Sequence, residues 1–151
     1  MVNYFVIAAV IAVVAIFFVV LTVGKYQQAR FTPVKIGNAT VNAEVADTEP
    51  KQVRGLMFRD KLPADDGMIF AFGGDGRHGI WMLNTSIPLD IVWLDKGKKV
   101  VHVEEKVPPC RALLVCPIYR PGPDSRYVLE VNSGFAKRHN IKEGSVAKFD
   151  L

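Results

Sequence analysis

The feature that most constrains this chain is an apolar run close to its start. Residues 4–23 (YFVIAAVIAVVAIFFVVLTV) are 20 consecutive residues without a charge, glycine or proline, and the first charged side chain is Lys25. A helix rises about 1.5 Å per residue, so a run of this length spans the roughly 30 Å hydrocarbon core of a bilayer. The sequence therefore predicts a transmembrane anchor over residues 1–24, a linker over 25–33 and a folded domain over 34–151.

A cleavable signal peptide is the alternative interpretation of this run. Thr22 and Gly24 are small enough for a cleavage site. However, no basic residue precedes the run, and it is longer than the 7–15 apolar residues that are typical of a signal peptide. We therefore favour a retained anchor that contacts the lipid bilayer through residues 4–23.

Two features of the sequence favour opposite sides of the membrane for the domain. Lys25 and Arg30 follow the apolar run, and by the positive-inside rule they place the domain in the cytoplasm. Cys110 and Cys116 favour the other side, because they can close a small disulfide ring, and disulfides persist mainly in oxidising compartments. A reduced pair or half of a metal site are the rival interpretations, although two cysteines cannot form a four-sulfur zinc site within one chain. We expect a single-pass membrane protein with an extracytoplasmic domain.

The distribution of charge argues against a nucleic-acid-binding protein. The formal net charge is +4, and Lys25, Arg30 and Lys35 supply three of the positive charges next to the apolar run. The rest of the domain is close to neutral, and its one basic cluster, residues 96–99, is typical of a solvated turn. We therefore expect no nucleic-acid partner.

Short alternating apolar segments separated by turn residues predict a domain rich in strands. The expected strands cover residues 34–45 (with a turn at Gly37), 68–72, 79–82, 89–94, 99–104, 126–131 and 141–146, and residues 73–76 are expected to form a loop. Together with two short helices, this pattern indicates an α+β fold that is mostly β, a small antiparallel barrel-like domain.

The two helices are indicated by capping residues. Thr48 followed by Pro50 marks the start of one helix, whose inward face would carry Val53, Leu56 and Met57. Ser133 would cap the other helix, over residues 134–139.

Asp90 is expected to be buried, because it lies between the apolar residues of a predicted strand. A buried carboxylate without a partner costs several kcal/mol. The planar guanidinium of Arg54 or Arg59 is a natural partner, and the resulting ion pair would hold the first helix against the sheet.

Trp81, Asn84 and Thr85 suggest a binding site, because an aromatic plate beside an amide and a hydroxyl often holds a sugar or a peptide. Asn84 and Thr85 could equally cap a turn. The candidate ligand-binding residues are Arg54, Trp81, Asn84, Thr85 and Asp90, beneath the proline-rich segment 106–125, for an unknown small molecule, glycan or peptide. We expect a membrane-anchored, non-catalytic binding or assembly module without a metal or another cofactor.

Two other function classes remain open at this point. Asp90 could act as the acid or base of an envelope hydrolase, although no Ser-His-Asp arrangement can be defended. Met57, Met68 and Met82 could supply thioether ligands for Cu(I), although methionine more often fills irregular gaps in a core.

Eight motifs, in order along residues 41–146, resemble the uncharacterised family known as domain of unknown function 192. They are Val45-Ala-Asp-Thr, Arg54-Gly-Leu-Met-Phe-Arg59, Gly67-Met-Ile-Phe70, Trp81-Met-Leu-Asn-Thr85, Ile87-Pro-Leu-Asp90, Val107-Pro-Pro-Cys110, Cys116-Pro-Ile-Tyr119 and Tyr127-Val-Leu-Glu-Val131. The resemblance implies a compact, mostly β barrel-like domain, often exported, with no established activity. Leu83 departs from the basic residue expected there, and residues 112–115 are more apolar than the family pattern implies.

Overall fold

The computed structural model describes residues 4–26, 29–111 and 115–151. Helix α1 (Tyr4–Tyr26) covers the apolar run and forms a unit separate from the domain, which begins at Phe31. Counted over the residues that are described, no helix is both long and apolar enough to cross a membrane. The anchor over residues 4–23 therefore stays a prediction from the sequence.

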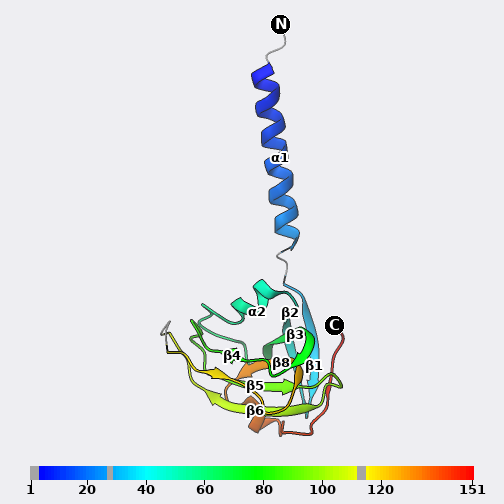
Figure 1. Cartoon of the computed structure of the whole chain (residues 1–151), viewed down its shortest axis with the longest axis vertical. Helices are drawn as coiled ribbons and strands as arrows, with labels where there is room; N and C mark the ends of the chain where they lie inside the picture. Colours follow the sequence, from blue (N-terminus) through cyan, green and yellow to red (C-terminus); the bar gives the residue numbers. More distant parts are fainter. Residues whose placement is uncertain (1–3, 27–28, 112–114) are drawn as a thin grey trace. The chain divides into compact units, whose positions relative to one another are not determined.

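The domain is built on one curled sheet, with a small second sheet beside it (Figure 1). Seven strands form the main sheet in the order β6-β5-β8-β3-β2-β1-β9, and β4 pairs with β7. Their bounds are β1 (Phe31–Ile36), β2 (Ala39–Ala46), β3 (Asp66–Gly76), β4 (Ile80–Trp81), β5 (Leu89–Leu94), β6 (Val100–Val107), β7 (Ile118–Tyr119), β8 (Ser125–Asn132) and β9 (Ala147–Lys148). All neighbours are antiparallel except β2 and β3, which are joined through the short helix α2 (Glu49–Arg54).

The two edges of the main sheet approach each other beside β6 and β9. Lys99 forms an isolated bridge with Val146, and the Val100 amide donates to the Ser145 carbonyl at 2.8 Å. The Ala147 amide donates to the Lys98 carbonyl at 2.9 Å. The sheet is therefore curled into a half-barrel, and the expected mostly β, α+β class is confirmed.

Both faces of the sheet are apolar, and each packs into a separate core. Because side chains alternate along a strand, Leu129 and Val131 of β8 pack into the enclosed first core, whereas Val128 packs into the second core. The first core also takes in Phe135 of helix α3 (Phe135–Arg138). The second core lies beneath α2 and the chain that follows it, and this face carries the candidate site.

The sequence places the start of α2 correctly, but the inward face predicted for it is wrong. The cap predicted for the second helix is also wrong, because α3 has Gly134, and not Ser133, as its N-cap residue. Thr48 is the N-cap residue, without a side-chain cap hydrogen bond, and Pro50 lies in the first turn. No residue of α2 is buried, and Val53 is 54% exposed. Leu56 is buried, but it lies beyond the helix, which ends at Arg54.

Three further boundaries differ from expectation. The sheet begins at Phe31, so the linker expected over 25–33 is shorter than predicted. Residues 73–76 continue strand β3 and are not a separate loop, since Gly76 pairs with Ser125 after a break in register. The last strand is 147–148, after a turn over the residues where a strand was expected.

Candidate functional site

A cavity of about 260 Å³ opens on the second face of the sheet. Its wall combines aromatic, aliphatic and polar side chains from segments far apart in the sequence. The lining residues are Glu49, Gln52, Val53, Arg54, Gly55, Leu56, Met57, Phe70, Phe72, Gly79, Ile80, Trp81, Thr85 and Glu130. Three of the five predicted ligand-binding residues, Arg54, Trp81 and Thr85, are among them, and Asn84 and Asp90 are not.

The end of α2 places the chain directly over strand β3. Gly55 follows the helix with φ +46°, a left-handed conformation that glycine adopts without strain. A Cβ atom there would lie 3.4 Å from the Phe70 ring. That distance is an ordinary contact, so the positive φ angle is what favours glycine between Arg54 and Leu56.

A backbone hydrogen bond joins the motif over residues 54–59 to the motif over residues 81–85. The Phe58 amide donates to the Asn84 carbonyl at 2.9 Å, and both residues have positive φ angles, +62° and +53°. The Thr85 amide also donates to the Met82 carbonyl at 3.0 Å. Asn84 therefore lies within a turn and does not line the cavity, in agreement with the alternative interpretation of this residue.

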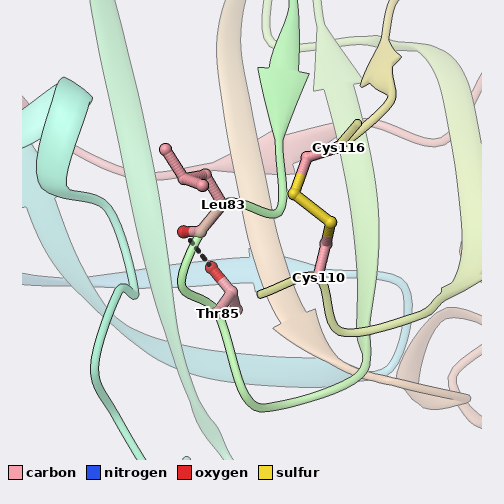
Figure 2. The surroundings of a disulfide bond; sticks show 4 residues. All are labelled: Leu83, Thr85, Cys110 and Cys116. Atoms are coloured by element: carbon pink, nitrogen blue, oxygen red, sulfur yellow. Dashed lines mark hydrogen bonds between the residues drawn. A yellow bond between two sulfur atoms is a disulfide. The ribbon is translucent and has the colours of Figure 1, made fainter. Parts of the chain in front are cut away.

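Trp81 and Thr85 reach the cavity from a segment that the disulfide loop braces. Trp81 is 43% exposed and pairs with Ile118 across the small sheet, whereas Thr85 is buried. The Thr85 hydroxyl donates only a long 3.4 Å bond to the Leu83 carbonyl (Figure 2). Since this bond is long, the hydroxyl remains available to a ligand.

Cys110 and Cys116 form a disulfide, which confirms the pairing favoured by their spacing (Figure 2). The Cys110 amide donates to the Thr85 carbonyl at 3.3 Å, and Cys110 also bridges Leu83. Within the described part of segment 106–125, no residue lines the cavity. The described residues of this segment support the cavity wall, and they do not line the cavity that the segment was expected to cover.

Glu130 is the site residue that the sequence analysis missed. It lies in the middle of β8, is 4% exposed, and lines the cavity. Its Oε2 atom is buried without a hydrogen-bond partner. The signal in the sequence is a single carboxylate inside the otherwise apolar segment 127–131.

The environment of Glu130 favours its neutral form. Burial raises the pKa of Glu130 from 4.5 to about 8, although the positive charge of Arg59 acts in the opposite direction. At neutral pH the side chain is therefore mostly a carboxylic acid, which can donate as well as accept a hydrogen bond.

The ion pair predicted between Asp90 and an arginine of the 54–59 motif is wrong. The Asp90 carboxylate is fully buried and accepts hydrogen bonds from three backbone amides: Lys106 at 2.8 Å, Gly134 at 3.0 Å and Ala136 at 2.9 Å. These bonds satisfy its charge without a cationic side chain.

The two arginines of that motif lie elsewhere. Arg59 is paired with Glu44 of β2, and Arg54 is exposed at the cavity. The buried Asp90 is therefore a clamp between β5, β6 and the start of α3, and it does not hold α2 against the sheet. Arg59 links the chain that follows α2 to β2.

The methionines proposed as copper ligands divide between core and cavity. Met68 and Met82 are buried in the second core, and Met57 lines the cavity. Among the described residues, no group of three or more His, Cys, Asp or Glu side chains could hold a metal ion. Copper binding stays an untested prediction, and core packing accounts for Met68 and Met82.

Comparisons with known proteins agree with the fold. The chain is 28% identical over 115 residues to a UPF0127 protein of Thermococcus gammatolerans, which covers 73% of this chain and 67% of that protein. A crystal structure of a protein of unknown function from Novosphingobium aromaticivorans superposes with a TM-score of 0.73 and 30% identity, over 78% of this chain and 84% of that one.

A second solved structure is similar to the same degree. A putative transcription regulator from Sinorhizobium meliloti gives a TM-score of 0.74 and 26% identity, over 81% of this chain and 95% of that one. The model of the family DUF192, described as an uncharacterized ACR, matches residues 32–149. Since that match spans nearly the whole domain, the chain belongs to the DUF192 family, as its motifs indicated.

Proposed function

We propose that this protein is a membrane-anchored binding module whose domain holds a small ligand in the cavity beside Trp81 and Glu130. The observation that carries the proposal is the Glu130 Oε2 atom, which is buried at the cavity without a hydrogen-bond partner. Buried polar atoms are nearly always hydrogen-bonded in folded proteins, so an orphaned one calls for an explanation. A ligand that supplies the missing partner is such an explanation.

The other groups on the cavity wall suit recognition of a small molecule. Trp81 exposes an aromatic surface, Thr85 offers a weakly engaged hydroxyl, and Arg54 presents a guanidinium. Ligand sites typically combine an apolar wall with a few polar groups that fix orientation. The volume of about 260 Å³ lies just below the usual range of sites for drug-sized molecules, so the ligand is small.

The anchor belongs to the same proposal and rests on the sequence. The apolar run of residues 4–23 supports insertion into a bilayer. The disulfide supports an extracytoplasmic domain, against the opposing indication of Lys25 and Arg30. Protease protection of the domain in sealed spheroplasts would decide its side of the membrane.

An acid–base enzyme is the second candidate, with Glu130 in place of Asp90. A carboxyl group that titrates close to physiological pH beside a cavity is suited to proton transfer. Asp90 does not support the original hydrolase hypothesis, because three amides hold it on the other face of the sheet. Turnover of a ligand that Glu130→Gln still binds but no longer converts would establish the enzyme.

Ligand-observed and protein-observed NMR test the binding module. The full chain, in phosphatidylcholine nanodiscs, is screened with a library of small fragments while the Trp81 indole N–H and Met57 methyl signals are followed. We expect a subset of fragments to shift both signals, and Trp81→Ala to abolish their binding. Phe31→Ala, which removes a half-exposed aromatic of β1 outside the cavity, is the matched control. If fragments shift neither signal, or bind Trp81→Ala unchanged, the proposal fails.

A further inference from the structure

The polar groups on the cavity wall differ in charge and in whether they can donate or accept a hydrogen bond. These differences indicate the kind of ligand that the cavity would bind. The inference drawn from them rests on the proposed binding function and specifies the ligand. Four properties decide it: the hydrogen-bond roles of the wall, its charge, its aromatic surface and its size.

The floor of the cavity needs a partner that can act as a hydrogen-bond donor or acceptor. Glu130 has one buried carboxyl oxygen without a partner. Its acid form donates and its carboxylate form accepts, so a ligand hydroxyl satisfies it in either state. A ligand group that can only accept a hydrogen bond satisfies only the acid form of Glu130. A ligand group that can only donate is less suited to the O–H of that acid form.

The side wall adds groups that accept hydrogen bonds. The amide nitrogen of Gln52 already donates to the carbonyls of Ala46, at 3.2 Å, and Ala71, at 2.8 Å. Only its side-chain oxygen is left to serve a ligand. The Thr85 hydroxyl, with its single long bond to Leu83, can accept from a ligand as well. Several acceptors beside a carboxylic acid suit a ligand with more than one hydroxyl group.

The charges around the cavity favour an uncharged ligand. Glu49 and Arg54, from the two ends of α2, both line it and are both exposed, so opposite charges lie at its wall. The carboxyl group at the floor is mostly neutral. An anion attracted by Arg54 is repelled by Glu49, and a cation meets the reverse arrangement. The combined electric field of Glu49 and Arg54 therefore favours neither an anionic nor a cationic ligand.

The aromatic surface and the size of the cavity complete the description. The half-exposed Trp81 ring provides a flat apolar surface beside Phe72 and Ile80 in the wall. The C–H face of a sugar ring packs on such a surface while its hydroxyls reach polar groups at the edges. A volume of about 260 Å³ accommodates one such ring but not a folded peptide or a dinucleotide.

We propose that the cavity binds one uncharged sugar ring of a glycan, with the ring against Trp81 and its hydroxyls bonded to Glu130, Thr85 and Gln52. The aromatic side chain fixes the plane of the sugar, and the three polar groups fix its rotation. A glycan in solution and one attached to the cell envelope share this chemistry.

The test uses the full chain in phosphatidylcholine nanodiscs, because sugar-based detergents would compete for the site. The probes are uncharged methyl glycosides of glucose, galactose, mannose and N-acetylglucosamine. Glucuronate and glucosamine serve as charged counterparts, and benzamide serves as a fragment that is not a sugar. Binding is measured from the shift of the Trp81 indole signal and from saturation transfer to each probe.

We expect at least one uncharged glycoside to bind in the millimolar range, and its charged counterparts to bind more weakly. Trp81→Ala should weaken binding about tenfold, which reflects loss of the aromatic contact. Thr85→Val, which keeps the side-chain shape but removes the hydroxyl, should weaken it roughly fivefold. Glu130→Leu should lose binding, whereas Phe31→Ala, outside the cavity, should have no effect.

Two results separate this inference from the function on which it rests. If benzamide or a charged probe shifts the Trp81 signal and no uncharged glycoside does, the sugar assignment is overturned and the binding cavity stands. If no probe of any class shifts that signal in a well-folded protein, both the assignment and the proposed binding function are overturned. Binding of a glycoside that is insensitive to Trp81→Ala also overturns the assignment.

Discussion

Asp90 and Glu130 lie on adjacent strands of the sheet but on opposite faces. In the pairing of β5 with β8, Asp90 is opposite Val131 and Ile91 is opposite Glu130, so the two carboxyl groups point away from each other. Asp90 is satisfied by three amides, and Glu130 has an oxygen without a partner. One buried carboxyl group thus holds the fold together, and the other is available to a ligand.

The first prediction concerns stability as a function of pH. The pKa of Glu130 is about 8 in the folded protein against 4.5 when the group is exposed to water. Between these values the unfolded chain has released the proton that the folded chain still holds, so stability falls as pH rises from about 4.5 to about 8. Glu130→Gln removes this loss. We expect the variant to exceed the wild type in unfolding free energy by roughly 3 kcal/mol at pH 7, with little difference near pH 4.5.

Urea unfolding of the wild type and the variant at pH 5, 6, 7 and 8 measures this difference. Glu105→Gln, at an exposed position of β6, is the matched control and should leave the pH profile unchanged. Parallel profiles for the wild type and Glu130→Gln would show that Glu130 is not held neutral by the fold.

The second prediction concerns the charge that acts on Glu130. Arg59 lowers the pKa of Glu130, against the larger effect of burial. Arg59→Met keeps much of the side-chain length and removes the charge, so the pKa of Glu130 should rise above its wild-type value of about 8. The Glu130 carboxyl carbon, followed by ¹³C NMR through a pH titration, reports this change directly.

Arg126→Met provides the control for that titration, because it also removes an arginine from an ion pair, in this case with Asp75. It should leave the midpoint of Glu130 in place. A lowered or unchanged midpoint in Arg59→Met would contradict the electrostatic role that we assign to Arg59.

The sequence predicts local structure in this domain better than contacts between distant segments. The β5–β6 hairpin, the turn at Gly37 and the disulfide all follow from residues close together in the chain, and the structure confirms them. The partners of Asp90 are backbone amides that lie 16, 44 and 46 residues away, and the residue types at those positions do not predict this contact. The sequence predicts an arginine as the partner of Asp90, because sequence patterns identify charged side chains but do not show which backbone amides lie nearby.

Glu130 was missed for a related reason. Within its own strand it is one polar residue among apolar ones, and either face of β8 could have been exposed to solvent. Only the pairing of Glu130 with Met68 on one side and Ile91 on the other shows that its face is covered. Burial of this kind depends on the order of strands in the sheet, which the sequence pattern left open.

The third prediction tests the structural role of Asp90. Asp90→Ala leaves the amides of Lys106, Gly134 and Ala136 without their acceptor, at hydrogen bonds that are partly buried in two cases and fully buried at Ala136. Each unsatisfied buried group costs about 1–3 kcal/mol, so the variant should lose several kcal/mol or fail to fold. Asp90→Asn retains one acceptor oxygen and should lose less. Chemical denaturation of both variants measures the difference.

A ligand-binding measurement distinguishes a structural role of Asp90 from a role in ligand binding. Folded Asp90→Asn should bind cavity fragments with the affinity of the wild type, because its side chain lies on the other face of the sheet. Asp124→Asn, at an exposed position, controls for a change of charge alone. A selective loss of binding in a stable Asp90→Asn protein would restore Asp90 to the candidate site.

The last prediction concerns the disulfide that braces the cavity wall. The bond between Cys110 and Cys116 closes a loop with a sequence separation of 6, and closing so short a loop stabilises the folded state by roughly 2 kcal/mol. These are the only two cysteines, so a reductant acts on this bond alone. We expect reduction, or the double variant Cys110→Ala/Cys116→Ala, to lower the unfolding free energy by that amount. Because Cys110 also bonds to the Thr85 carbonyl, amide exchange should increase at residues 83–85 before global unfolding. Hydrogen exchange with and without reductant measures this, and unchanged protection there would show that the disulfide does not support the wall.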